Sequence, residues 1–189
     1  ASKKEHEQIT TNPEEIQQKE YKEERTEINI KLDTNKGIFQ SKDLNIEEKN
    51  YLYNHGYKTG KFVPINKKNW EEYYVKTNNI ESIEHTFLVK NIREEIEKYT
   101  KEITVNLTRD ADIVFTNNEG KTIAIEVETG LSYKKHKIEL ENKFNEAQLK
   151  HKNNLYIILT DKNYKQRYQQ KFPKIKIMLR KDVPAIIYT

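Results

Sequence analysis

Two glutamates occupy a segment that otherwise has the composition of a β-strand. Residues 122–128 read Thr-Ile-Ala-Ile-Glu-Val-Glu, and the two-residue period of a strand places Ile125 and Val127 on one face and Glu126 and Glu128 on the other. Like charges two residues apart on one strand repel each other, and Glu has a low strand propensity. A binding or catalytic site would explain why both residues are there.

A third carboxylate belongs to the preceding strand-like segment. Asp112 lies in the run Ala-Asp-Ile-Val-Phe at 111–115, and the sequence Asn-Asn-Glu-Gly at 117–120 is typical of a hairpin turn. Counting back through this hairpin places Asp112 opposite Ile125 or Glu126. Three hard oxygen ligands in one small patch favour Mg²⁺ or Mn²⁺. The alternative is an ordinary solvated face of an antiparallel hairpin.

Two further residues border this predicted site, each with two interpretations. Glu84 lies one turn before Leu88 at the start of an expected helix, where it is either part of the site or a complement to the helix dipole. Lys143 lies beside the apolar stripe of a later expected helix, next to Phe144. It is either a catalytic lysine or a side chain that extends along the apolar face to water.

The elements that must position these residues follow from periodicity, which from residue 80 onward predicts the order α-β-β-β-α-β-α-β. A helix of about 17 residues begins at Asn79 or Ser82. The expected strands lie at 103–107, 110–115, 121–128, 155–159 and 175–179, with an edge strand at 184–188. The other expected helices lie at 134–153 and 164–172.

The N-terminal part is less informative. Residues 1–26 hold five basic and seven acidic residues and few apolar ones, so we expect a charged tail or a lone surface helix. Residues 27–79 combine a strand-like run at 28–32, a helix near 46–55 and an aromatic cluster around Trp70. They predict a small α/β subdomain in front of a core at 80–189. Removing the tail's charge of −2 raises the net charge from +4 to +6, which favours polyanionic partners.

Composition excludes several classes of protein. The 189 residues include no cysteine, which rules out disulfides, thiolate zinc sites, iron–sulfur clusters and thiol nucleophiles. No Gly-x-Ser-x-Gly or Gly-x-Gly-x-x-Gly motif is present, so a serine hydrolase and a Rossmann dinucleotide site are excluded. No apolar run approaches the roughly 18 residues of a membrane span, and the first residues lack a signal peptide's apolar centre. The expected location is the cytoplasm, with no membrane association.

Asp112, followed after thirteen residues by Glu126-x-Glu128 within this element order, resembles the PD-(D/E)XK nuclease superfamily over about residues 80–180. The resemblance implies an α/β fold with a restriction-endonuclease-like core, αβββαβ, in which helices flank a mixed central sheet, here with a small N-terminal α/β extension. It also implies that Asp112 and Glu126 bind the catalytic Mg²⁺ or Mn²⁺, and that Glu84 is an additional metal-linked residue. The run at 124–130 is similar to nuclease-like domains of plasmid and other mobile-element proteins.

The chain departs from the superfamily pattern at two positions. Ala111 replaces the proline before the aspartate, and Glu128 occupies the position of the lysine. Some members of the superfamily place Glu there and others supply the lysine from the following helix, which makes Glu128 and Lys143 the candidate catalytic residues. Strand alternation fixes Glu128 beside Glu126, whereas a helix places Lys143 only near the edge of its stripe. We therefore expect Glu128 to contribute more to cleavage.

Basic residues on the two later helices are candidates for phosphate contacts. They are Lys134, Lys135, Lys137, Arg167 and Lys171. Tyr164, Tyr168 and Phe172 recur every four positions beside the last two of these bases, and we expect them to form the core stripe of that helix.

The expected function is therefore a divalent-metal-dependent DNA endonuclease or nickase, acting as a homodimer or within a larger nucleic-acid-processing assembly. The alternative is a non-cleaving relative that keeps the fold as a DNA-binding or assembly module, because the usual lysine is missing. A glycosidase is disfavoured. Carboxylates at positions i and i+2 of one strand point the same way, whereas a glycosidase needs them on both sides of the scissile bond.

Overall fold

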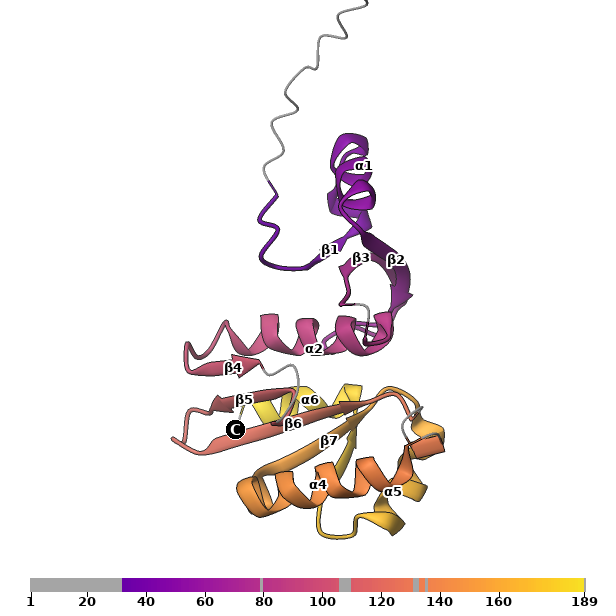
Figure 1. Cartoon of the computed structure of the whole chain (residues 1–189). Coiled ribbons are helices and arrows are strands. Elements are labelled where there is room, and N and C mark those ends of the chain that lie inside the picture. The colour runs from indigo at the N-terminus through magenta and orange to yellow at the C-terminus, as the bar shows by residue number, and fades with distance from the viewer. Residues whose placement is uncertain (1–31, 79, 106–109, 131–132, 135, 189) are drawn as a thin grey trace, which may run out of the picture.

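Two β-sheets and five α-helices make up the described part of the chain, which is of mixed α/β class (Figure 1). The computed structural model describes residues 32–188 apart from 79, 106–109, 131–132 and 135. The predicted tail at 1–26 lies outside the described residues, as does nearly all of the strand-like run at 28–32.

The larger sheet has five strands in the order β4-β5-β6-β7-β8. Strand β5 pairs antiparallel with both β4 and β6, whereas β6, β7 and β8 pair parallel. The central strand β6 therefore joins an antiparallel half to a parallel half. The strands are β4 (Ile103–Val105), β5 (Ile113–Thr116), β6 (Thr122–Glu128), β7 (Leu155–Leu159) and β8 (Lys176–Leu179).

Helices cover both faces of this sheet (Figure 1). On one face α2 (Ile83–Ile96) and α6 (Val183–Ile187) pack in a cluster with Ile125 and Val127 of β6. On the other face α4 (Lys137–His151) and α5 (Lys165–Lys171) pack in a second cluster. The apolar stripes of α2, α4 and α5 provide the contacts, as their periodicity predicts.

A smaller antiparallel sheet, in the order β1-β3-β2, precedes α2. It consists of β1 (Ile38–Gln40), β2 (Tyr57–Phe62) and β3 (Glu71–Lys76), with α1 (Ile46–Asn54) between the first two. Asn45 and Glu48 form a capping box at the start of α1, near the predicted start of this helix. Phe87 of α2 packs in the core of the smaller sheet, so α2 lies between the two sheets and contributes to both cores.

The hairpin of β5 and β6 has one of the two registers that the sequence predicts. Ile113 pairs with Ile125, which leaves the preceding Asp112 at the level of Glu126. Strand β5 starts at Ile113 rather than at residue 110, because the N–H of Asp112 donates to the Glu126 side chain instead of to a backbone carbonyl.

Some predicted bounds are wrong. The expected edge strand at 184–188 is the helix α6. Pro184 lies in its first turn, where proline is favoured, and Ile186 and Ile187 are buried against the larger sheet. Helix α2 is capped by Ser82 but has 14 residues rather than about 17, and α4 begins at Lys137 rather than at residue 134. No helix in the described residues is both long and apolar enough to cross a membrane.

Candidate active site

Two hydrogen bonds join Asp112 to Glu126 and Val127 across the hairpin of β5 and β6. The backbone N–H of Asp112 donates to Glu126 Oε2 at 2.9 Å, and the backbone N–H of Val127 donates to Asp112 Oδ2 at 2.7 Å. Each carboxylate thus accepts a hydrogen bond from the other strand, just past the last backbone pair of the hairpin. The prediction that these two acids converge is confirmed.

The acidic face is buried rather than solvated. Glu126 is 0 % exposed, Glu128 6 % and Asp112 7 %. Helices α4 and α5 cover the face of β6 that carries the glutamates, so the alternative of a solvated hairpin face is wrong. Burying three carboxylates is costly unless each is hydrogen-bonded or paired with a cation, so their partners decide what the site can do.

Lys143 provides the first compensating charge. It lies on α4 immediately before the buried Phe144, and its Nζ forms an ion pair with Glu126 Oε1. The Lys143 side chain remains 43 % exposed, so the cation that pairs with the buried carboxylate is still in contact with solvent. The sequence placed this lysine only at the edge of the apolar stripe, whereas the structure brings it into contact with a predicted metal ligand.

His85 is the second partner of these carboxylates. It lies in the first turn of α2, and its Nε2 is 3.2 Å from Asp112 Oδ2, while Nδ1 is 3.5 Å from Glu81 Oε2. Burial disfavours the protonated imidazole, but the carboxylates of Asp112 and Glu81 outweigh this effect and raise the pKa of His85. The site thus brings a lysine and a histidine to three carboxylates.

Glu128 is the third carboxylate of the same cluster. The Tyr168 hydroxyl of α5 donates to Glu128 Oε2 at 3.3 Å. Burial, together with the negative charge of Asp112, raises the pKa of Glu128 to about 7, although His85 and the Tyr168 hydrogen bond act in the opposite direction. Burial is the largest of these effects, and it favours the protonated form of the Glu128 carboxyl.

A divalent cation fits this donor set in two respects. Carboxylates are the ligands that Mg²⁺ and Mn²⁺ prefer, and Oδ1 of Asp112 accepts no hydrogen bond from a described residue. Against this, the described residues contain no group of three or more His, Asp or Glu side chains spaced to hold a metal ion. The structure therefore offers two convergent ligands, Asp112 and Glu126, rather than a complete protein cage.

Glu84 is not brought to these carboxylates. Its side chain is exposed on α2 and makes no hydrogen bond or ion pair with a described residue. It lines a different recess, together with Trp70 and Arg180. At the start of α2 it is the neighbouring His85 that contacts Asp112.

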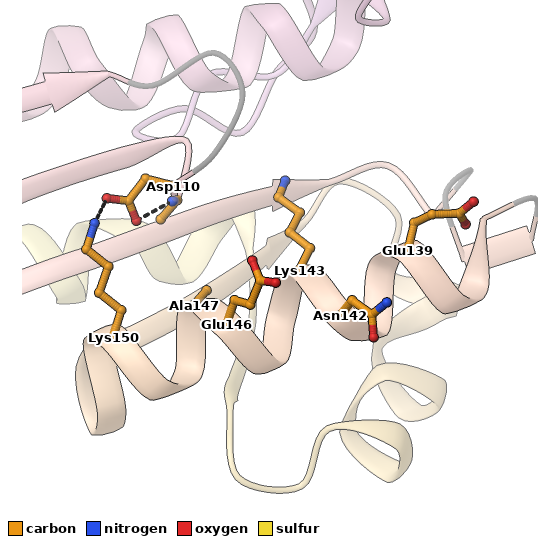
Figure 2. Close-up of a pocket in the computed structure, with 8 residues that line it drawn as sticks. Asp110, Glu139, Asn142, Lys143, Glu146, Ala147 and Lys150 are labelled. Atoms are coloured by element: carbon orange, nitrogen blue, oxygen red, sulfur yellow. Dashed lines mark hydrogen bonds and ion pairs between the residues drawn. The ribbon is translucent and has the colours of Figure 1, made fainter.

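An open pocket of about 780 Å³ runs along α4 beside Lys143 (Figure 2). One end is formed by Asp110, whose carboxylate pairs with Lys150 and with His151 at 2.8 Å. Burial raises the pKa of Asp110, but the hydrogen bonds from Lys150 and His151 outweigh it and hold this pKa at about 2. Lys143 lies along the same wall, so the pocket gives a solvent-filled approach to the amine that contacts Glu126.

The predicted phosphate-binding residues that the structure describes lie on the surface of the molecule. Lys134, Lys137 and Arg167 are exposed, and the Lys134 amine lies 5.4 Å from the centre of the Tyr164 ring. Lys171 pairs with Glu141 at 2.7 Å, which reduces its availability for phosphate. Lys135 lies outside the described residues.

Two residues of the site were missed by sequence reasoning. His85 precedes Leu88 and Val89 by three and four residues, so helical spacing alone places it on the buried face of α2. Tyr168 was correctly predicted as part of the core stripe of α5 and is fully buried, but nothing in the sequence indicates that its hydroxyl reaches Glu128.

Comparisons with known proteins add no family assignment. The chain matches no protein-family model, no curated protein and no solved structure.

Proposed function

We propose that this chain is a divalent-metal-dependent DNA endonuclease or nickase with a restriction-endonuclease-like core, in which Asp112 and Glu126 hold Mg²⁺ or Mn²⁺. The observation that carries the proposal is the pair of reciprocal hydrogen bonds that fixes these two carboxylates side by side on β5 and β6. The strand order β4 to β8, with α2 on one face and α4 on the other, agrees with the αβββαβ order of the PD-(D/E)XK resemblance.

The protein side chains have separate roles in this proposal. A bound Mg²⁺ supplies positive charge that stabilises the charge developing on the phosphodiester. Lys143, which contacts Glu126 and is half exposed, orients the attacking water or neutralises a phosphate oxygen. Glu128 is the alternative group for orienting or deprotonating that water. The exposed bases near the starts of α4 and α5 hold the DNA backbone.

Lys143 and Glu128 compete for the role of the catalytic residue. Sequence reasoning ranks Glu128 higher, but the direct contact of Lys143 with Glu126 and the burial of Glu128 beneath Tyr168 now favour Lys143. Lys143→Met keeps the apolar stem without the charge, and Glu128→Gln keeps the shape without the base. A general base or acid contributes about 10²-fold to 10⁴-fold in rate, so comparing the nicking rates of the two variants identifies the residue that acts.

The metal site is tested by calorimetric titration of Mn²⁺ into wild type, Glu126→Ala and Glu84→Gln. We expect binding to be lost in Glu126→Ala and retained in Glu84→Gln, because only Glu126 lies beside Asp112. Plasmid nicking in Mg²⁺, Mn²⁺ and EDTA provides the matching activity assay. Equal Mn²⁺ binding by wild type and Glu126→Ala would remove the site.

One observation favours a second candidate, a nuclease-fold module that binds DNA or assembles with other proteins without cleaving. Within the described residues the carboxylates have protein partners in Lys143 and His85, and no group of three metal-binding side chains is found. Such a module would bind DNA equally well in EDTA and Mg²⁺ and would leave plasmid intact in either. The proposed nuclease cleaves only with the metal.

A further inference from the structure

A small recess with one polar wall lies at the junction of the two sheets, next to the candidate active site. Its volume is about 140 Å³, and its walls come from β2, the turn before β3, the start of α2, and the residues that follow β7 and β8. The size and the mixture of ring and charged side chains suit a single planar, polar ring system.

The floor of this recess is aromatic and rigid. Phe62 of β2 and Phe87 of α2 are buried and stacked, with ring centres 4.3 Å apart and an angle of 13° between the ring planes. Trp70 stands at the wall with 71 % of its surface exposed and no ring contact to a described residue. A large exposed indole beside a fixed aromatic floor is a surface on which another ring can stack.

The polar wall offers one acceptor and one donor group. Glu84 is exposed and unpaired within the described part of the chain. Arg180 uses Nη1 to donate to the carbonyls of Pro64, at 2.6 Å, and Lys67, at 3.4 Å, which fixes the loop below Trp70. Its Nε and Nη2 groups keep their N–H donors. Nucleobases present this complement, since their exocyclic amines donate to carboxylates and their carbonyl oxygens and ring nitrogens accept from guanidinium groups.

The recess and the carboxylates share residues of the same elements. Thr160, which lines the recess, donates its N–H to the carbonyl of Glu128 at 3.0 Å. Glu84 in the recess is followed directly by His85, whose ring contacts Asp112. A nucleic acid strand whose phosphate lies at Asp112 therefore passes within reach of this recess.

We propose that the recess receives one unstacked nucleobase of the DNA strand bound at the carboxylates, with the base against Trp70 and its amino group on Glu84. This deepens the proposed function and rests on it for the position of the strand. A paired base inside a duplex cannot reach such a pocket unless it is unpaired and turned out. The preferred substrate is therefore DNA with unpaired nucleotides, such as a single strand, a flap or a distorted junction.

The chain contains one tryptophan, so its fluorescence reports directly on the recess. In EDTA, which prevents cleavage, we expect short single-stranded oligonucleotides rich in dC or dA to quench Trp70 fluorescence, and a blunt duplex of equal length to leave it nearly unchanged. Oligo-dT has no exocyclic amine and should bind more weakly. In Glu84→Gln the affinities for oligo-dC and oligo-dT should differ less than in the wild type.

Affinity measured by anisotropy of labelled DNA gives the second readout. Trp70→Leu should weaken single-strand binding by about 5-fold to 150-fold, the effect of losing one base stack, and leave duplex binding unchanged. The matched control is Tyr53→Leu, since Tyr53 is similarly exposed on α1 but does not line the recess. It should change neither affinity.

Three results would overturn the proposal: equal quenching by duplex and single strand, unchanged single-strand affinity in Trp70→Leu, or fluorescence that responds to protein concentration instead of DNA. The last would mean that a second copy of the chain fills the recess. None of these results depends on a metal. If Glu126→Ala abolishes cleavage while Trp70→Leu is neutral, the nuclease proposal stands and the base-binding recess falls. If Trp70→Leu weakens single-strand binding but no metal supports cleavage, the base-binding recess stands and the nuclease proposal falls.

Discussion

The ion pair between Lys143 and Glu126 makes a testable contribution to stability. Lys143→Met removes the charge and keeps most of the side-chain volume, so the core contacts of α4 should persist. Glu126 then remains fully buried with one carboxylate oxygen still hydrogen-bonded to the Asp112 N–H and the other without its cation. The variant therefore measures the cost of leaving a buried carboxylate partly uncompensated.

The magnitude follows from the different burial of the two partners. Removing one partner of a fully buried pair costs about 3 to 5 kcal/mol. Because the Lys143 side chain is 43 % exposed, water can approach from the α4 pocket and replace part of the lost interaction. We expect Lys143→Met to lower the free energy of unfolding by about 1.5 to 3 kcal/mol, between the values for exposed and buried pairs.

Lys150→Met is the matched control on the same helix. Lys150 pairs with Asp110, but its side chain is 61 % exposed and Asp110 keeps a second partner in His151. Its loss should cost about 0 to 1 kcal/mol. Urea unfolding followed by circular dichroism, in EDTA at neutral pH, measures both variants under the same conditions.

A metal titration of the same variants separates a structural role of the lysine from a role in the site. If Asp112 and Glu126 bind Mg²⁺, the ion replaces the missing ammonium, and at a hundredfold excess over its dissociation constant it adds about 2.7 kcal/mol of stability. The deficit of Lys143→Met should then shrink in Mg²⁺. Equal losses for Lys143→Met and Lys150→Met in EDTA would contradict this prediction, because they would show that the buried Glu126 carboxylate is not stabilised by the Lys143 amine.

Three other predictions concern the titration of Glu128, the salt dependence of DNA binding and the N-terminal cap of α2. In EDTA the free energy of unfolding should fall by ~1.4 kcal/mol from pH 6 to pH 8, because the pKa of Glu128 is about 7 in the folded state and ~4.3 in the unfolded state, so the folded state loses its extra proton in this range. In Glu128→Gln the free energy of unfolding, measured by the same urea titrations, should depend less on pH. An unchanged pH dependence in this variant would contradict the assignment to Glu128. DNA affinity should fall steeply as salt rises and should survive deletion of residues 1–26, which carry a charge of −2; an anisotropy titration that is flat in salt, or that depends on the tail, contradicts this. Ser82→Ala should lower the free energy of unfolding, measured by heat or urea, by about 1 kcal/mol, because the Ser82 hydroxyl accepts a hydrogen bond from the backbone N–H of His85 at the start of α2. Ser82→Asp should leave the free energy of unfolding nearly unchanged.

The hairpin of the core could be predicted because its information is local. Alternation fixes the faces of β6, and the turn at 117–120 limits the register to two choices, of which the structure has the one that places Asp112 opposite Glu126. A register error of one residue would have moved every side chain of one strand to the other face. The apolar run of β7 and the stripe of α5 were identified for the same reason, since their patterns extend over a few consecutive residues.

Short elements near proline were harder to predict. The segment at 184–188 has the β-branched residues typical of a strand, yet Pro184 lies in the first turn of α6 and Ile187 packs on the sheet. Burial against the face shared with α2 decides the conformation here, and the local sequence is compatible with both outcomes.

The partners of the carboxylates depend on distances that no sequence pattern encodes. Helical periodicity shows that Lys143 borders a buried face, but whether its amine reaches Glu126 depends on how far α4 lies from β6, which the packing of Phe144 sets. The same holds for Tyr168, whose pattern marks it as core while its hydroxyl ends on Glu128. Burial of three carboxylates could be inferred from their strand context, and electrostatics then requires nearby cations and donors. That requirement predicts that compensating groups exist, and it restricts the search to residues one turn from the apolar stripes, where both His85 and Lys143 lie.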